Sequence, residues 1–310
     1  MNLIETALAE ISPQLRPWIS HSDLHMALAA EFEHARRHTT DLDAATRFAA
    51  LCPVPDTQPQ NYLGQRLDLG THEALVGIRF LGLDPNTPFV DVLATSFPLD
   101  DIDALRRCLR AACDAYAVFA PRRVRLRTGR AETETTLSAH FDVACDQRIL
   151  AGPLEQLHAT PKHPEAYRLT LRRCVDTAFY ARFRATYTAF NAHHRPPDDP
   201  IHVSTEDDLR SVVARGHVYE AFIDDRWAGV VAADPSTLFG AEGFVVHEML
   251  LDESFRGQGW GVALQQALIE QLAPEGGLLF GTIAASNTAS LRTAQRVGRI
   301  DVGGWLFVEA

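Results

Sequence analysis

The chain has 310 residues, of which 46% are hydrophobic and 22% charged, so it is long enough for two domains with separate cores. This composition excludes a disordered protein. Its 40 acidic and 29 basic side chains give a formal net charge of −11, which repels nucleic acids and anionic membranes at long range and favours a cationic partner.

The start of the chain and the cysteines indicate a cytoplasmic protein. Glu5 and Glu10 stand where a secretion signal needs positive charge, and no apolar run approaches the roughly 18 residues of a membrane span. The 5 cysteines are odd in number and lack the paired spacings of a disulfide framework or a zinc site. We therefore expect reduced thiols and no membrane segment.

Two pairs of histidines have the four-residue spacing that places both rings on one helical face, as metal ligands require. The pairs are His21 with His25 and His34 with His38. No carboxylate accompanies them in the pattern of a metal-binding helix, so we interpret them as surface or capping residues and expect no metal.

The first half is predicted to be mixed α/β from its hydrophobic periodicity and turn residues. Its elements in chain order are two helices within residues 22–51 separated by a cap at Asp41, strands at 74–83 and 89–96, a helix at 100–117 and a strand at 124–130.

Residues 152–164 contain three prolines and little periodicity, which favours a linker between domains. We accordingly place an N-terminal mixed α/β domain at residues 1–155 and a second domain at residues 165–310.

The second half alternates strands and helices, which is typical of an α/β layer. The elements predicted there are strands at 167–172, 217–224, 227–233, 243–251, 278–284 and 304–308, an aromatic helix ending before Pro196-Pro197, a helix capped by Ser204 with Asp207, and helices at 264–272 and 290–297. The aromatic stripe consists of Phe179, Phe183, Tyr187 and Phe190, and helical spacing predicts that it is core.

A glycine-rich turn, Arg256 to Gly261, lies between an apolar strand and an amphipathic helix. Glycines allow a tight turn whose N–H groups, with the helix dipole, can bind an anion such as pyrophosphate. Val262-Ala263 stands where a Walker loop needs Lys and Ser or Thr, and Leu264 occupies the third glycine position of a dinucleotide fold, so both of these sites are excluded.

The turn resembles the acyl-CoA loop of GNAT N-acetyltransferases, R/Q-x-x-G-x-G/A, with Arg256, Gly259 and Gly261 in the defining positions. The preceding Met249-Leu250-Leu251 resembles the fourth strand of that family, and Asn287-Thr288-Ala289-Ser290 resembles its second motif. The resemblance implies the GNAT fold, a mixed and mostly antiparallel twisted sheet flanked by helices, preceded here by the other mixed α/β domain.

The resemblance also implies acetyl-CoA as the cofactor, bound between the fourth and fifth strands. Main-chain groups of Leu250 and Leu251 would hold the pantetheine and polarise the thioester carbonyl. The cofactor-binding residues that the resemblance implies are Met249, Leu250, Leu251, Arg256, Gly257, Gln258, Gly259, Trp260, Gly261, Asn287 and Ser290. Asn287 and Ser290 alternatively cap the helix that they begin.

Transfer to an amine needs a base, and His247 and Glu248 lie on the strand beside the reacting carbonyl. Strand alternation predicts that at most one of them points into the cleft, and we favour Glu248 as the base. The family's usual tyrosine acid is replaced by Ala294, so Ser290 is the candidate that assists the departing thiolate.

The first half repeats the order strand, strand, helix, strand, which indicates a degenerate second GNAT-like unit. Phe97-Pro98-Leu99-Asp100-Asp101 replaces the glycine turn there, and its carboxylates would cap the helix and repel a pyrophosphate. We therefore expect no coenzyme A in this half.

The sequence thus predicts an N-acetyltransferase that moves an acetyl group from acetyl-CoA to an amine of a small molecule or peptide. A non-catalytic acyl-CoA-binding sensor or regulatory protein is the alternative. Neither nucleic acid nor membrane is an expected partner, and the oligomeric state stays open, with a homodimer as one option.

Overall fold

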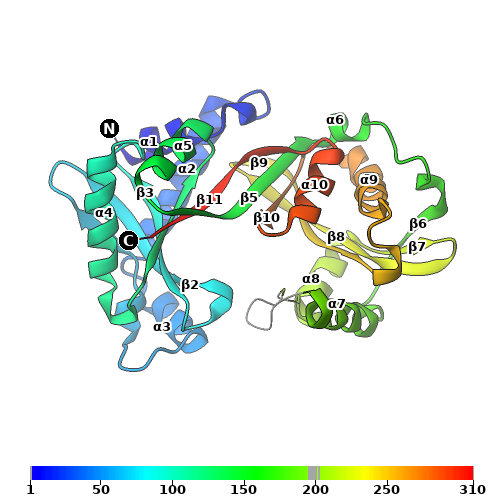
Figure 1. Cartoon of the computed structure of the whole chain (residues 1–310), viewed down its shortest axis with the longest axis horizontal. Coiled ribbons are helices and arrows are strands. Elements are labelled where there is room, and N and C mark those ends of the chain that lie inside the picture. The colour runs from blue at the N-terminus through cyan, green and yellow to red at the C-terminus, as the bar shows by residue number, and fades with distance from the viewer. Residues whose placement is uncertain (1, 195–200, 202, 310) are drawn as a thin grey trace. The chain divides into compact units, whose positions relative to one another are not determined.

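The computed structural model describes residues 2–194, 201 and 203–309. The chain divides into two compact units, Met1–Arg148 with Val302–Ala310, and Ile149–Asp301 (Figure 1). The first unit thus includes the end of the chain. The predicted domain limits, 1–155 and 165–310, place the end of the chain in the second domain. These limits concern independently folding domains and stay a prediction.

The first unit packs helices against a sheet with strand order β1-β2-β3-β4-β11-β5. Its helices are α1 (Leu3–Glu10), α2 (His21–Arg37), α3 (Leu42–Leu51), α4 (Ile102–Ala115) and α5 (Ala131–His140), and its strands are β1 (Gln65–Asp68), β2 (Glu73–Phe80), β3 (Pro88–Thr95), β4 (Arg123–Thr128), the start of β5 (Val143–Pro153) and most of β11 (Ile300–Glu309).

These elements confirm the helices, hairpin, third helix and third strand predicted for the first half, including Asp41 as the cap of α3. The prediction missed α1, β1, α5 and the start of β5. The first two are short, and α5 buries only Thr133 and Leu137, so it carries no apolar stripe that a periodicity could reveal.

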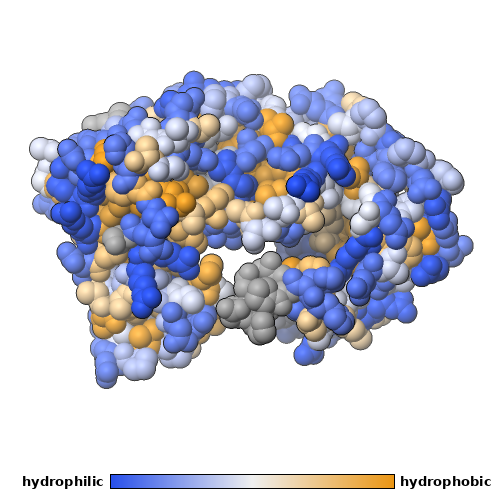
Figure 2. Space-filling view, in the orientation of Figure 1, coloured by the Kyte–Doolittle hydropathy of each residue, from blue (hydrophilic) through white to orange (hydrophobic). Residues whose placement is uncertain are grey.

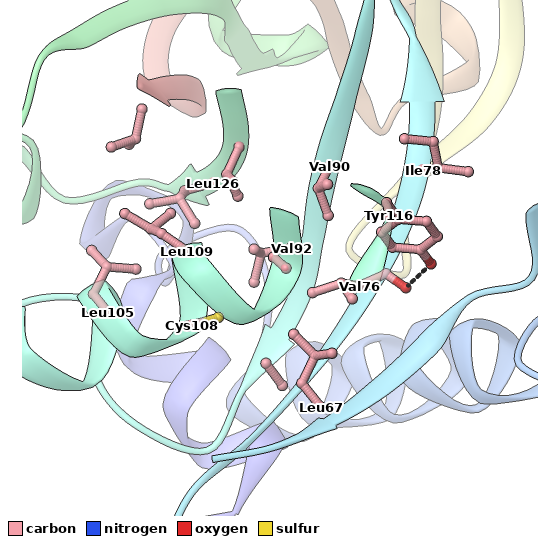
Figure 3. Packing of buried hydrophobic residues seen from close by; sticks show 14 of the residues in the cluster. Leu67, Val76, Ile78, Val90, Val92, Leu105, Cys108, Leu109, Tyr116 and Leu126 are labelled. Atoms are coloured by element: carbon pink, nitrogen blue, oxygen red, sulfur yellow. Dashed lines mark hydrogen bonds between the residues drawn. The ribbon is translucent and has the colours of Figure 1, made fainter. Parts of the chain in front are cut away.

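The core of the first unit lies between α4 and the sheet. Leu105, Cys108 and Leu109 of α4 point toward strand residues such as Leu126 (Figure 3). Tyr116, which follows α4, is fully buried, and its hydroxyl donates to the carbonyl oxygens of Leu63 at 2.7 Å and Val76 at 3.3 Å. The end of the helix is thereby tied to two other segments of the chain.

The second unit has strand order β5-β10-β9-β8-β7-β6. Its helices are α6 (Leu154–His158), α7 (Tyr180–His194), α8 (Glu206–Arg215), α9 (Trp260–Leu272) and α10 (Thr288–Arg296), and its strands are the end of β5 (Val143–Pro153), β6 (Leu169–Arg173), β7 (Val218–Ile223), β8 (Arg226–Leu238), β9 (Ala241–Leu251) and β10 (Leu278–Ala284). Single 3₁₀ turns occur at Pro13–Leu15, Pro59–Tyr62, Leu81–Leu83, Ala117–Phe119, Ala166–Arg168, Glu253–Phe255 and Ala273–Glu275.

Helices cover both faces of this sheet because successive strand residues point to opposite sides. Val218, Val230 and Ala232 pack with α7 and α8, whereas Tyr219 and Val231 pack with α6 and α9. Figure 1 shows α9 on one side of β7 and β8 and α7 with α8 on the other. Strands β6 to β9 are antiparallel and β9 pairs with β10 in parallel, so the predicted mixed, mostly antiparallel α/β fold is confirmed.

Three local predictions for the second half differ from the structure. The linker expected at 152–164 is wrong in its first part, because β5 continues to Pro153 and α6 follows with Leu154 and Leu157 buried in the core. The capping box is formed by Thr205 and Asp208, one residue later than predicted. Pro196 and Pro197, expected to end the aromatic helix, lie outside the described residues.

The face of the molecule in Figure 2 is mostly hydrophilic, with hydrophobic side chains gathered over parts of it. Among the described residues, no helix combines the length and apolar character needed to cross a membrane.

The buried hydroxyl of Tyr116 provides a test of the first unit. Tyr116→Phe leaves two buried carbonyl oxygens without this donor, so the free energy of unfolding should fall by about 1–3 kcal/mol. Equilibrium urea unfolding would measure the change. Tyr167→Phe is the matched control, since Tyr167 is 83% exposed and its change should stay within about 0.5 kcal/mol. Equal effects of the two variants would contradict the assigned role of Tyr116.

Candidate functional site

The central feature of the second unit is the separation of β9 and β10. These parallel strands pair only from Gly243 with Leu278 to Val245 with Phe280, although they continue to Leu251 and Ala284. A cavity of about 330 Å³ is lined by residues from both strands beyond the last pair. Backbone groups on the facing edges of the strands are therefore without a strand partner in this region.

A β-bulge on β9 shapes the same place. Ala232 of β8 pairs with Glu248 and the next residue, Ala233, pairs with Val246, so His247 is the extra residue. A bulge interrupts the alternation of side chains. Both His247 and Glu248 line the cavity, and the prediction that at most one of them points into the cleft is wrong for this reason.

Glu248 is held by two hydroxyl groups. The phenol of Tyr187 donates to one carboxylate oxygen at 2.8 Å, and Ser204 Oγ donates to the other at 2.5 Å. Glu248 is 8% exposed. Burial, followed by the charge of Glu248, raises the pKa of Tyr187, so the phenol keeps its proton and stays a donor.

The sequence did not indicate these two partners of Glu248. Tyr187 was assigned to the core stripe, and it is indeed buried with Phe179 and Phe183 in the cluster under α7 and α8. Ser204 was assigned to a helix cap, which Thr205 forms instead. The aromatic stripe itself was the only sequence signal, because it brings one hydroxyl to an otherwise apolar helix face.

Two further cavity residues carry buried polar atoms that have no hydrogen-bond partner among the described residues, His247 Nε2 and Gln265 Oε1. Gln265 comes from α9 and is 1% exposed, and its Nε2 donates to the sulfur of Met249 at 3.4 Å. Buried polar atoms are normally satisfied, so these two atoms indicate a ligand or water in the cavity.

Asn287 and Ser290 meet at the start of α10. Asn287 Oδ1 accepts a hydrogen bond from the backbone N–H of Ser290 at 3.1 Å, so the capping alternative is correct for Asn287. Both residues also line the cavity, which leaves the Asn287 amide nitrogen and the Ser290 hydroxyl beside it.

Arg299 reaches the cavity from the connection between α10 and β11. It is 2% exposed, and its guanidinium donates to the carbonyl oxygen of Leu150 at 2.7 Å and 3.1 Å and to that of Gly281 at 3.4 Å. The sequence analysis gave no role to Arg299. The sequence feature that could have indicated a role for Arg299 is a charged residue beside apolar residues at the start of a strand.

The glycine-rich turn follows β9 after the 3₁₀ turn Glu253–Phe255 and leads into α9. Gly257 and Gly259 have φ of +74° and +86°, a region that other residues rarely adopt, and Gly259 is the N-cap of the helix. Within the described part of the chain, no group accepts a hydrogen bond from the backbone N–H groups of residues 257–261. A row of unbonded N–H groups at a helix N-terminus is suited to an anion.

The side chains around the turn fix its position. Arg256 Nε donates to the carbonyl oxygen of Leu251 at 2.8 Å, and its guanidinium lies 4.3 Å from the centre of the Phe190 ring. Burial lowers the pKa of Arg256. A Cβ on Gly261 would lie 3.3 Å from Thr293 Oγ1, so glycine lets α9 approach α10 closely.

The predicted site residues therefore form two groups. Glu248, Met249, Asn287 and Ser290 line the cavity, and residues 256–261 form the turn beyond the end of β9. Leu250 is 3% exposed, belongs to the core and pairs through its backbone with Val230 of β8, so the predicted backbone role is left to Leu251.

Metal binding finds no support among the described residues, where no group of three or more His, Cys, Asp or Glu side chains could hold an ion. His34 and His38 contact each other, with their Nε2 atoms 2.9 Å apart.

The first unit has a comparable pair of strands with different chemistry. β3 and β4 are parallel and pair only at Val90 with Val124 and Asp91 with Arg125. Arg125 forms ion pairs with Asp91 at 2.9 Å and with Asp146 at 3.2 Å. Asp101 caps α4 by accepting from the N–H of Ala104 at 3.0 Å, which confirms that a carboxylate occupies this helix N-terminus.

Comparison with known proteins gives one family. The family model described as "Acetyltransferase (GNAT) family" matches residues 178–298, which include α7 to α10 and both groups of site residues. No curated protein matches the chain.

Several solved structures are similar in overall form. A GNAT-family acetyltransferase from Colwellia psychrerythraea is 11% identical, with 77% of this chain and 84% of that chain covered and a TM-score of 0.49. A GCN5-related N-acetyltransferase from Sphaerobacter thermophilus is 18% identical, covers 87% and 91%, and has a TM-score of 0.48. A tandem GNAT protein from the clavulanic acid biosynthesis pathway is 13% identical, covers 88% and 96%, and has a TM-score of 0.45. Similarity at this level carries no argument about function.

The family model covers the segment in which the sequence resemblance was found, and the structure there has the mixed sheet and helices that the resemblance implied. The chain therefore contains a C-terminal domain of the acetyltransferase (GNAT) family.

Proposed function

We propose that this protein transfers an acetyl group from acetyl-CoA directly to an amine. The observation that carries the proposal is the separation of β9 and β10, which leads from a cavity containing a buried carboxylate to a glycine turn with unbonded N–H groups. A family of acyltransferases matches this same segment.

The residues present fit coenzyme A in three respects. The N–H groups of residues 257–261 and the N-terminus of α9 suit a pyrophosphate, with Arg256 adding positive charge beside them. The unpaired backbone edges of β9 and β10 suit the amides of the pantetheine arm. Asn287 and Ser290 offer further polar groups along the cavity. When bound, the coenzyme supplies an activated acyl thioester.

Glu248 is the residue that we assign as base. Each of its oxygens accepts one hydroxyl hydrogen bond, which positions the carboxylate, and a carboxylate oxygen can accept more than one hydrogen bond. The acceptor ammonium loses one proton to Glu248 before its nitrogen attacks the thioester carbon. The carbon–sulfur bond then breaks, the amide bond forms, and the second proton of the amine goes to the leaving thiolate.

Three other residues assist in this scheme. Tyr187 acts as a positioning residue, because its retained proton holds Glu248 in place. The backbone N–H of Leu251, which points away from β8, is assigned to the thioester carbonyl, and Ser290 is assigned to the sulfur.

A sensor that binds acyl-CoA without transferring the acyl group is the second candidate. It is favoured by one observation, that position 294 is a fully buried alanine and provides no phenol to protonate the thiolate. Binding of acetyl-CoA without release of free coenzyme A in the presence of amines would support the sensor.

The glycine turn can be tested by Gly259→Asp. The variant adds an anion beside the unbonded N–H groups, and its Cβ would lie 2.8 Å from His163 Nε2, so acetyl-CoA should bind at least about 100-fold more weakly. Calorimetric titration of acetyl-CoA would measure the affinity.

Gly82→Asp is the control for this variant, because Gly82 also has a left-handed backbone, with φ +60° and ψ +20°, and open space around it. Both variants carry roughly 1–2 kcal/mol of backbone strain, and only Gly259→Asp should lose the cofactor. Wild-type affinity in folded Gly259→Asp protein would show that the turn is not the cofactor site.

The role of Glu248 can be tested by Glu248→Gln. Loss of the base should lower kcat by about 100- to 10,000-fold while acetyl-CoA affinity stays nearly unchanged. Chromatographic quantification of free coenzyme A and acetylated amine gives the rate. Glu242→Gln, an exposed carboxylate on the same strand, should behave like wild type. A Glu248→Gln enzyme with full kcat would remove Glu248 from the mechanism.

A further inference from the structure

The most unusual charge in the second unit is the guanidinium of Arg299. It is 2% exposed, its hydrogen bonds go to two backbone carbonyl oxygens, and no carboxylate of the described residues pairs with it. Burial lowers the pKa of Arg299 to about 10, because desolvation disfavours the charged guanidinium. Buried charges in proteins are normally paired, so a lone guanidinium calls for an anionic partner.

Arg299 lies at the point where β9 and β10 begin to separate. A Cβ on Gly281 would be 3.1 Å from Arg299 Nη2 and 3.5 Å from Val246 Cβ. Gly281 and Val246 are the residues that directly follow the last strand pair, Val245 with Phe280. The end of β9 at Leu251 is five residues farther, or about 16 Å along the strand. The pyrophosphate turn, which comes after Leu251, is thus too distant to bring a phosphate to Arg299.

The remaining nitrogen of Arg299 is available to a ligand. Nε and Nη2 make the hydrogen bonds to Leu150 and Gly281, and Nη1 makes none with the described residues. Guanidinium groups bind carboxylates through charge-assisted hydrogen bonds.

The same cavity also contains an opposite charge. Among the described residues that line it, the ionisable ones are Tyr187, His247, Glu248 and Arg299, which include one carboxylate and one guanidinium. The unpartnered atoms Gln265 Oε1 and His247 Nε2 can accept hydrogen bonds from an ammonium or amine. A polyamine would match Glu248 and leave Arg299 uncompensated, whereas a molecule with both an amine and an anionic group would match both.

We propose that the acceptor is an amine that carries a carboxylate, as an amino acid does, with its carboxylate bound by Arg299 and its amine directed to Glu248. This inference rests on the acetyl transfer proposed above. The net charge of the chain favoured a cationic acceptor, and this inference replaces it with a zwitterionic one. Charges inside the cavity lie closer to the bound substrate than surface charges do, so they are screened less by salt.

The experiment compares matched acceptors. The full chain is incubated with acetyl-CoA and a panel of α-, β- and γ-amino acids, each paired with its carboxamide, and the acetylated products are quantified by chromatography. The carboxylate member of the preferred pair should have a kcat/KM at least about 100-fold higher than the carboxamide, since the amide leaves Arg299 without its anion.

Three variants assign that preference to Arg299. Arg299→Gln should raise KM for the carboxylate member and abolish the preference, and Arg299→Lys, which keeps the charge, should retain part of it. Arg296→Gln removes an exposed arginine of α10 and should leave the preference intact. Thermal unfolding gives a readout independent of turnover, because the carboxylate member should raise the Tm of wild type and Arg296→Gln but not of Arg299→Gln.

The outcomes separate this inference from the proposed function. Equal use of both members, use of carboxamides alone, or acetyl-CoA binding with no turnover of any panel member would overturn the carboxylate inference. Absence of acetyl-CoA binding by the wild-type chain would instead contradict the proposed transferase.

Discussion

The limited pairing of β9 and β10 is the constraint from which the other features of the second unit follow. Two parallel strands that share only three residue pairs leave their later backbone groups facing a gap. The bulge at His247 places two consecutive polar side chains at that gap, and Glu248 is then fixed by hydroxyls from α7 and the α8 entry. The chain that leaves β9 at Leu251 passes through one 3₁₀ turn and the glycine turn into α9, so the N-terminal N–H groups of α9 follow the strand that borders the separation.

The parts of the site that sequence could predict are those determined locally. The glycine turn is one, because the positive φ angles at Gly257 and Gly259 are a property of the residues themselves. Tyr187 and Arg299 could not be assigned, since the partner of Tyr187 lies 61 residues away and that of Arg299 149 residues away. The fold class followed from the alternation of strands and helices along the sequence. The side-chain alternation assumed for His247 and Glu248 did not hold, because one bulge interrupts it.

The two units share one strand arrangement but differ in whether its polar groups are paired within the protein. In each, a parallel pair of strands shares very few residue pairs and is connected by a helix that begins just after the first strand. In the first unit, Arg125 is neutralised by Asp91 and Asp146, and Asp101 closes the helix N-terminus. In the second unit, Arg299 and the N–H groups of the glycine turn have no such protein partners among the described residues. Buried polar groups that have hydrogen-bond partners in the protein favour stability, and those without such partners favour ligand binding.

The assignment of Val302–Ala310 to the first unit has a consequence for biosynthesis. Residues Gly304 to Glu309 pair with Thr128 to Arg123 of β4, so a strand that lies far along the chain covers this edge of β4. During translation β4 keeps an open edge until β11 has been made, and open edges are prone to pair with other chains. The net charge of −11 makes copies of the chain repel one another at long range, which opposes such pairing.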